Sequence, residues 1–302
     1  MVVEYQGVDI TAAVQVEGAK YIDRAGGGAD TLDMLFSDTE ELWGKWGPQL
    51  GDKIRVRDEA QDTGIMYVDS VAQRSGVYGV GAISVPPSMR SNAWRGINGA
   101  TLPDLAQQIA ARHGLTALIL PGVPQSLFGA MTQSGQTDLE WLAHLATLNG
   151  CAVKGYNGQL VVFHEPTQEH GISTVVELGT AEPWQFTSAA TDRFAACTAS
   201  GGGLVHTFRI DADGRTMQVP DLPARSYGDL ERFAKGLLRA RNKYQRQGRC
   251  APEYASAIAA GMMIDFGSAS GMAAGSWYVD EARHDLKNKA TELRLRGALE
   301  GY

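Results

Sequence analysis

The stretch ADTLDMLFSD (residues 29–38), followed by GDKIRVR (residues 51–57), decides the fold class. Apolar and polar residues alternate in both, which predicts strands with one buried face. Between them, SDTE (residues 37–40) is a capping-box pattern and predicts a short helix, ended by WGP (residues 46–48). Return strands are expected within residues 65–84. Residues 1–100 are therefore predicted to form a compact antiparallel β unit.

The composition supports a mainly β protein. The chain has 302 residues, of which 36 are glycine and only 11 proline. Glycines scattered between short apolar runs are typical of many turns. The formal net charge of −7 argues against a general nucleic-acid binder, because phosphate contacts need a basic surface.

The cysteines and the N-terminal sequence indicate the cellular compartment in which the protein is made. Cys151, Cys197 and Cys250 show no paired spacing, so we expect no disulfide framework and a reducing compartment. The N-terminus lacks a basic segment followed by an apolar core, and no stretch approaches about 18 apolar residues. We therefore expect neither a signal peptide nor a membrane span.

Residues 101–171 show a helical pattern. An apolar stripe predicts a helix that begins at the cap Thr101. TDLE (residues 137–140) is a second capping box and predicts another helix. Asn157-Gly158 between two apolar runs predicts a hairpin. A small α+β insert is expected here.

Residues 172–302 return to strands around one long helix. Strands are predicted at 187–199 and 203–210, and three later ones near 254–259, 262–266 and 277–284. This segment is expected to form a second β unit.

The long helix, residues 226–246, begins at the cap Ser226 and lies in a strongly basic segment. Residues 225–249 hold eight cationic residues: Arg225, Arg232, Lys235, Arg239, Arg241, Lys243, Arg246 and Arg249. The charged face of this helix is either solvated or in contact with an acidic neighbouring subunit. Both interpretations stay open.

Three segments contain residue types found in ligand-binding motifs, but their residue spacing does not match those motifs. Residues 163–170 contain two His and two Glu, but not the H-E-x-x-H order, and Pro166 breaks a helix, so a solvated loop is expected. Asp211-x-Asp213-Gly214 begins like a calcium loop without the closing Glu, so a hairpin turn is expected. The glycines of 26–28 and 76–81 lack a phosphate-loop pattern.

Single reactive side chains have simpler roles. Cys151 is expected to be a small buried residue, and His284 to lie at a surface or interface. The six tryptophans are expected mainly in the core, with Trp184, after Pro183 in a linker, as a candidate interface residue. No G-x-S-x-G motif occurs. We predict no catalytic, cofactor-binding or metal-binding residue, no cofactor and no enzymatic activity.

Four segments, in this order, resemble the phage late control gene D family, the baseplate central hub proteins of contractile phage tails. They are ADTLDMLFSD (29–38) with WGPQLGDKIRV (46–56); RSNAW (90–94) leading to Thr101; QSGQTDLEWL (133–142) with GQLVV (158–162); and GMMIDF (261–266) with GSWYVDEARHDL (275–286). The chain is also similar to the hub part of type VI secretion spike proteins.

The resemblance implies two tail-tube-like antiparallel β-barrels, in residues 1–100 and 172–302, separated by an α+β insert domain in 101–171. It implies a homotrimer that links the tail tube to the central spike and forms part of the channel. The expected partners are the spike, the tail tube protein, baseplate wedge proteins and the tape measure protein, with DNA only as passing cargo during genome ejection.

The expected location of this late structural protein is the virion tail baseplate, assembled in the bacterial host cytoplasm. One alternative is the hub of a tailocin or type VI-like injection apparatus. Another is a tail-associated peptidoglycan hydrolase, since paired catalytic carboxylates need only spatial proximity.

Overall fold

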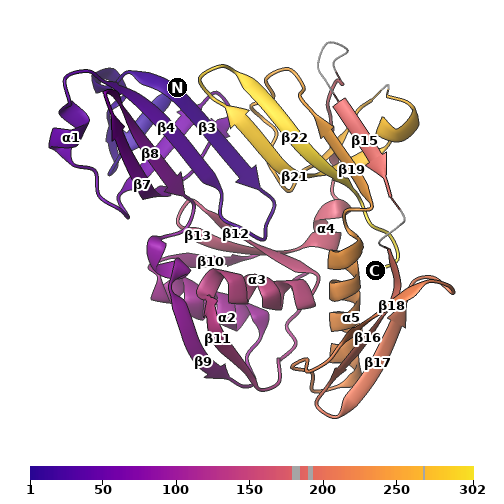
Figure 1. Cartoon of the computed structure of the whole chain (residues 1–302). Helices are drawn as coiled ribbons and strands as arrows, with labels where there is room; N and C mark the ends of the chain where they lie inside the picture. The colour runs from indigo at the N-terminus through magenta and orange to yellow at the C-terminus, as the bar shows by residue number, and fades with distance from the viewer. Residues whose placement is uncertain (179–183, 190–192, 268) are drawn as a thin grey trace.

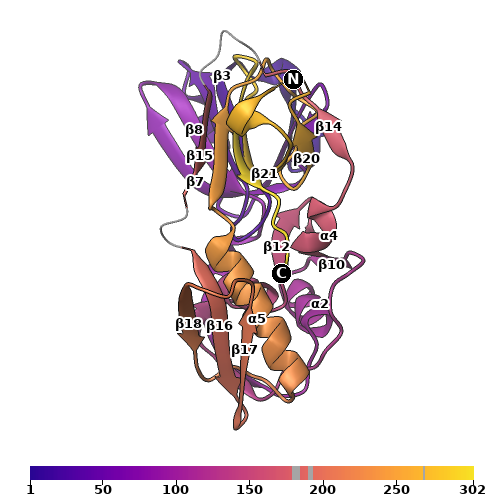
Figure 2. The same cartoon turned by 90° about the vertical axis from the view of Figure 1, so that its right-hand side faces the viewer.

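The computed structural model describes residues 1–178, 184–189, 193–267 and 269–302. Two β units lie side by side above a lower lobe that contains most of the helices (Figure 1; Figure 2). The predicted fold class, mainly β with a smaller α+β part, is confirmed. None of the helices in these residues is long and apolar enough to cross a membrane.

The first β unit contains the stretch 29–38. Its elements are β1 (Val2–Tyr5), β2 (Val8–Asp9), β3 (Val16–Arg24), β4 (Thr31–Asp38), α1 (Leu42–Trp46), β5 (Lys53–Asp58), β6 (Gln61–Asp62), β7 (Met66–Arg74) and β8 (Gly76–Ile83). Leu32, Met34 and Phe36 of β4 are fully buried while Asp33 and Leu35 are exposed, so the predicted alternation is confirmed.

The predicted helix start in this unit is wrong by several residues. The cap of α1 is Glu41, in the left-handed region at φ 55°, and no side chain caps it. Asp38 Oδ1 instead accepts the backbone N–H of Trp43 at 3.0 Å. Ser37 and Asp38 still pair with β8, so β4 continues through Asp38 and the helix begins later than predicted.

The second β unit consists of β14 (Ser173–Val175), β15 (Trp184–Ser188), β19 (Arg246–Cys250), β20 (Met263–Asp265), β21 (Ser276–Asp285) and β22 (Ala290–Gly297). The prediction of a strand at 254–259 is wrong, since that segment forms turns. The sheet instead contains β19, which was not predicted, between β15 and β22.

One sheet runs through both units, in the order β15-β19-β22-β21-β3-β4-β8-β7-β5-β1-β2. The junction is the antiparallel ladder of β21 with β3, in which residues 281–285 pair with residues 20–24. Gln61 reinforces it by donating to the carbonyl oxygens of Ser256 and Ile258, at 2.6 and 3.1 Å. The two units are therefore joined by backbone pairing.

Among the described residues, the lower lobe contains four α-helices, α2 (Leu102–Arg112), α3 (Asp138–Leu148), α4 (Glu165–Glu169) and α5 (Tyr227–Asn242). Its strands are β9 (Asn92–Ile97), β10 (Thr116–Ile119), β11 (Met131–Thr137), β12 (Cys151–Tyr156), β13 (Gln159–His164), β16 (Phe194–Gly201), β17 (Leu204–Arg209) and β18 (Arg215–Val219). Capping by Thr101, Thr137 and Ser226 is confirmed.

The hairpin at Asn157-Gly158 is also confirmed. Both residues have positive φ, 48° and 75°, as the tight turn between β12 and β13 requires.

Residues 194–242 pack with the middle of the chain. α5 and the sheet β17-β16-β18 share one apolar core with α2 and α3, in which Phe233 stacks on Phe128 at 5.8 Å. The strand predicted at 187–199 is two strands in different sheets, β15 and β16. Residues 190–192 between them, and Pro183 of the predicted linker, lie outside the described residues. The division at residues 100 and 171 stays a prediction.

Candidate functional site

The outer end of the first β unit carries exposed apolar side chains. Leu42, Trp46 and Leu50, in α1 and the loop after it, are 58%, 50% and 66% exposed. Trp43 points inward and stacks on Phe36, with ring centroids 4.2 Å apart. The exposed side chains therefore stand on a packed base at one extremity of the molecule (Figure 1).

The outer end of the second β unit has a similar character. Trp184 on β15 is 53% exposed, and Met272 in the turn Gly271–Ala273 is 50% exposed. Phe186 fixes β15 to the core, because its ring lies 4.8 Å from that of Trp277.

Both outer ends also present strand edges. Among the described residues, β15 pairs only with β19, and residues 70–74 of β7 pair only with β8. Unpaired backbone groups on edge strands are sites where another chain can add. The molecule therefore has two outer ends that combine free edges with exposed apolar side chains.

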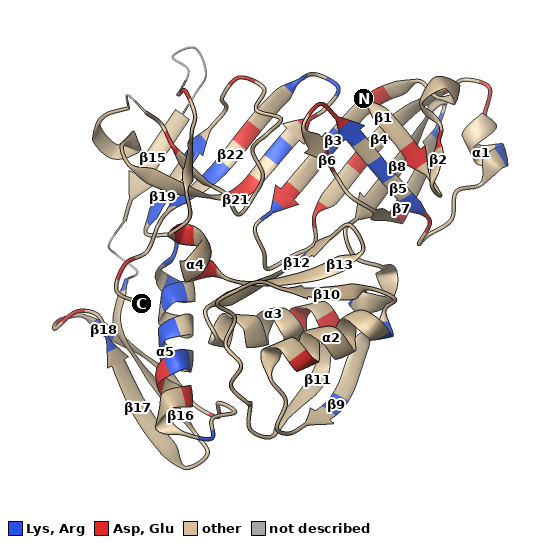
Figure 3. Cartoon of the chain, turned by 180° about the vertical axis from the view of Figure 1, so that it is seen from behind, with Lys and Arg blue, Asp and Glu red and all other residues tan. Residues whose placement is uncertain are grey.

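Between the outer ends, one face of the shared sheet carries charges of both signs. Lys20 lies across from Asp33 on β4 and Asp285 on β21, and Arg283 lies across from Glu292. Red and blue segments accordingly alternate over β3, β21 and β22 (Figure 3). This face lines a hollow of about 920 Å³. Opposite charges face one another across strands, so the face has little net charge.

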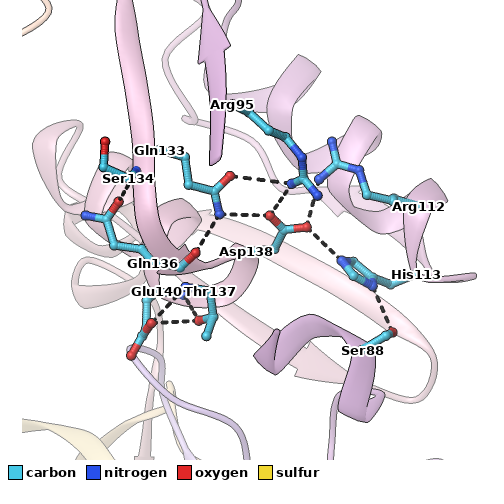
Figure 4. A network of polar contacts seen from close by, with 10 residues as sticks. All are labelled: Ser88, Arg95, Arg112, His113, Gln133, Ser134, Gln136, Thr137, Asp138 and Glu140. Carbon is cyan, nitrogen blue, oxygen red and sulfur yellow. Dashed lines mark hydrogen bonds and ion pairs between the residues drawn. The ribbon is translucent and has the colours of Figure 1, made fainter. Parts of the chain in front are cut away.

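A polar network centred on Asp138 fixes the lower lobe (Figure 4). This carboxylate accepts hydrogen bonds from Arg95, from Arg112 at 2.7 Å, from His113 at 2.8 Å and from Gln133 at 3.0 Å. Burial opposes its ionisation, but the bonds from His113, Gln133 and Arg112 outweigh burial and lower its pKa to about 2. β9, β11, α2 and α3 meet at this residue.

The network has the geometry of a structural tie. The second ring nitrogen of His113 is bonded to Ser88 Oγ at 2.8 Å, so both nitrogens of the imidazole are engaged. Asp138 is bonded at the same time by Arg95, Arg112 and Gln133, so the network ties together β9, β11, α2 and α3. Only the capping box of Thr137 with Glu140 was visible in the sequence, because three of the four side-chain partners of Asp138, Arg95, Arg112 and His113, lie 25 to 43 residues away.

The segment 163–170 is not the predicted solvated loop. It forms the end of β13 and the short helix α4, and Glu165 and Glu169 are buried. His164 bonds Thr167 Oγ1, and His170 donates to the carbonyl oxygen of Pro166. No set of three or more potential metal ligands occurs in the described residues. The signal that was missed is the i, i+4 spacing of the two glutamates.

The basic helix is largely neutralised within the chain. Five of the eight cationic residues in the segment 225–249 have acidic partners: Arg232 with Asp229, Lys235 with Glu231, Arg239 with Glu165 and Glu169, Lys243 with Glu165, and Arg249, which lies in β19, with Glu292. Arg239 is only 2% exposed. The interpretation of a wholly solvated face is therefore wrong for Arg239, while contact with a neighbouring subunit stays a prediction.

His284 is fully buried, so its predicted surface position is wrong. Its ring lies 6.4 Å from Tyr21, and its nitrogens meet Gln61 and Thr291, both at 3.1 Å. Burial lowers its pKa, which keeps the ring neutral at pH 7. It belongs to the junction of the β units.

The tryptophans divide evenly. Trp43, Trp141 and Trp277 are buried, as predicted, whereas Trp46, Trp94 and Trp184 are at least half exposed. The prediction of a core position is wrong for Trp46 and Trp94, whereas the interface role given to Trp184 stays a prediction.

The remaining predictions concern a turn and a thiol. The segment 211–214 is not a hairpin turn, because β18 pairs in parallel with β16 and the segment crosses the end of that strand. Cys151 is buried as expected, and burial raises the pKa of its thiol to about 12.

Comparison with known proteins finds solved structures of similar fold. No family model and no curated protein sequence matches the chain. Among solved structures, it is similar to a tail protein from Neisseria meningitidis MC58, with a TM-score of 0.74 at 15% identity over 98% of this chain and 95% of the other. The 43 kDa tail protein of prophage MuSo2 from Shewanella oneidensis gives 0.70 at 10% identity, over 98% and 97%.

A third similar structure belongs to a secretion machine. An Escherichia coli component of the type VI secretion system, described as similar to T4 bacteriophage tail proteins, gives a TM-score of 0.61 at 12% identity, over 97% of this chain and 75% of the other. The likeness in all three spans nearly this whole chain. It shows a shared fold.

Proposed function

We propose that this chain is the central hub of a contractile phage tail baseplate, in which three copies form a ring that joins the tail tube to the central spike. The observation that carries the proposal is the sheet shared by two β units, with an open outer end on each. Three copies placed head to tail would set six β units around one axis. Such a ring would let a three-fold spike meet a six-fold tube.

The outer ends support head-to-tail contact. They differ from each other, one built from α1 and β7 and the other from β15 and the turn at Met272. A contact between unlike surfaces closes into a ring when the rotation allows, and it covers edges that are otherwise free to aggregate. Exposed Trp46 and Trp184 are the residue type that most often dominates binding energy at interfaces.

The charged face between the outer ends supports the channel role. It is hollowed, and in the proposed ring it would face the axis. Cross-strand pairing leaves it little net charge. DNA binds strongly where many cations neutralise its phosphates, so a balanced face would let it pass. We propose that the spike and the tail tube protein dock on the two rims of this ring.

A type VI-like injection apparatus is the second candidate, and the similarity to the Escherichia coli secretion component favours it. The architecture would be the same, so gene neighbours decide, because capsid genes accompany only a phage. Both candidates are structural and without turnover. Clear lysis on a cell-wall zymogram would contradict both.

The interface can be tested with charged substitutions. Trp46→Lys and Trp184→Lys each spoil one outer end, and Trp94→Lys, at 71% exposure in the lower lobe, is the matched control. We expect light scattering to give a trimer mass for the control and lower masses for the other two. Mixing the two lower-mass variants should give dimers, because each retains the end that the other lacks. Trimers of Trp46→Lys alone would contradict head-to-tail contact.

A further inference from the structure

Six charged residues lie where the second β unit meets the lower lobe. We name them the ionic clasp: Glu165 and Glu169 of α4, Arg239 of α5, Lys243 at the end of α5, Asp280 of β21 and Arg296 of β22. The side chains of Glu169 and Arg296 have no exposed area. Acidic α4 lies directly above the basic upper turns of α5 (Figure 3).

Glu169 is the centre of the ionic clasp. Its Oε1 accepts from both Arg239 and Arg296, and its Oε2 accepts from the backbone N–H of Leu299 at 3.0 Å. Glu165 adds a contact of 3.3 Å to Arg296 and one of 3.6 Å to Arg239. Arg239 belongs to the lower lobe and Arg296 to the second β unit, so both parts use the same two carboxylates.

At the ionic clasp, the apolar core of the second β unit is separate from that of the lower lobe. The core of the second β unit includes Phe266, Trp277 and Leu293, and that of the lower lobe includes Leu142 and Phe233. No buried apolar residue in the described ranges is common to the two cores. The first β unit contributes three buried residues to the lower-lobe core, Tyr67, Ile83 and Val85, whereas after β22 it is the partly buried Tyr302 that packs against this core.

A buried charge cluster specifies geometry more than it adds stability. Exchanging such a cluster for apolar residues of similar size is often neutral or stabilising, whereas any shift that separates its members leaves buried charges unpaired. Apolar contacts, in contrast, tolerate sliding because they have no direction. We infer that the ionic clasp sets the orientation of the second β unit relative to the lower lobe, and that the two parts rotate against each other when it is removed.

The orientation can be measured between spin labels in the full chain. Cysteines replace exposed Gln107 on α2 and exposed Glu253 in the second β unit. The native cysteines are buried and stay unlabelled. Labelled chains are diluted into unlabelled protein, so that only distances within one chain are read. The wild type should give one narrow distance distribution.

The decisive variant is Glu169→Met with Arg239→Met and Arg296→Met. We expect its melting temperature to stay within a few degrees of the wild type and its distance distribution to be at least twofold wider. Arg249→Met with Glu292→Met, which removes an exposed pair between β19 and β22, is the control and should leave the width unchanged. A narrow distribution at the wild-type distance in the triple variant would overturn the inference.

A milder variant gives the answer if the triple one does not fold. Arg296→Lys keeps the charge but loses the fork that reaches both glutamates. The inference requires a wider distribution for this variant also. An unchanged width would overturn it.

Discussion

Replacing Gly236 by alanine tests the placement of α5 against α3 in the lower lobe. A Cβ at this position would lie 2.4 Å from the carbonyl oxygen of Thr147, 2.7 Å from that of Leu148 and 2.9 Å from the backbone nitrogen of Gly150. These are backbone atoms, so they cannot move aside as the end of a side chain can. The whole helix must shift.

The magnitude follows from two opposing effects. Alanine in place of glycine inside a helix stabilises by about 1 kcal/mol. Overpacking costs about 1–3 kcal/mol, and contacts this short with backbone place Gly236→Ala at the upper end. We expect a net loss of about 2 kcal/mol in the free energy of unfolding.

Gly228→Ala in the same helix is the control, because its nearest atom is Ser226 Oγ at 3.7 Å. The assay is urea unfolding followed by circular dichroism, with the midpoint compared at unchanged slope. The control should be neutral or slightly stabilised. If Gly236→Ala is as stable as Gly228→Ala, the close packing of α5 on α3 is refuted.

Two further predictions concern titratable groups. The folded pKa of Asp138, about 2, lies below its usual 3.8, so it contributes about 2 kcal/mol that is present above pH 4 and lost as the pH falls toward 2. Asp138→Asn should therefore lower stability at pH 7 in urea unfolding and flatten the acid dependence; an unchanged acid profile would refute this role. The three thiols are buried with raised pKa values of about 11 to 12, so a thiol reagent at pH 8 should react with none in the native protein and with three per chain after denaturation. Rapid labelling of the native protein would contradict their burial.

Local patterns were readable from the sequence. The alternation in 31–36, the caps at Thr101 and Thr137, and the Asn157-Gly158 turn each depend on residues that are neighbours in the chain. Such signals survive folding because their partners are at most four residues away.

Tertiary partners were not readable. Arg239 and Glu169 are 70 residues apart in the sequence, and there each looks like a solvated charge. Folding brings them into direct contact. β19, with the sequence RQGRC, has no strand pattern of its own, and only its pairing with β15 and β22 makes it a strand. In β22 the fully buried Arg296 stands in an exposed phase of the alternation. Packing decided these cases against local propensity.

The mass of the purified wild-type chain, alone and with its candidate spike protein, tests the hub proposal most directly. Light scattering should give three times the mass of one chain. Addition of the spike protein should increase this mass by the mass of one trimeric spike. A chain that remains monomeric at high concentration and does not bind the spike would contradict the proposal.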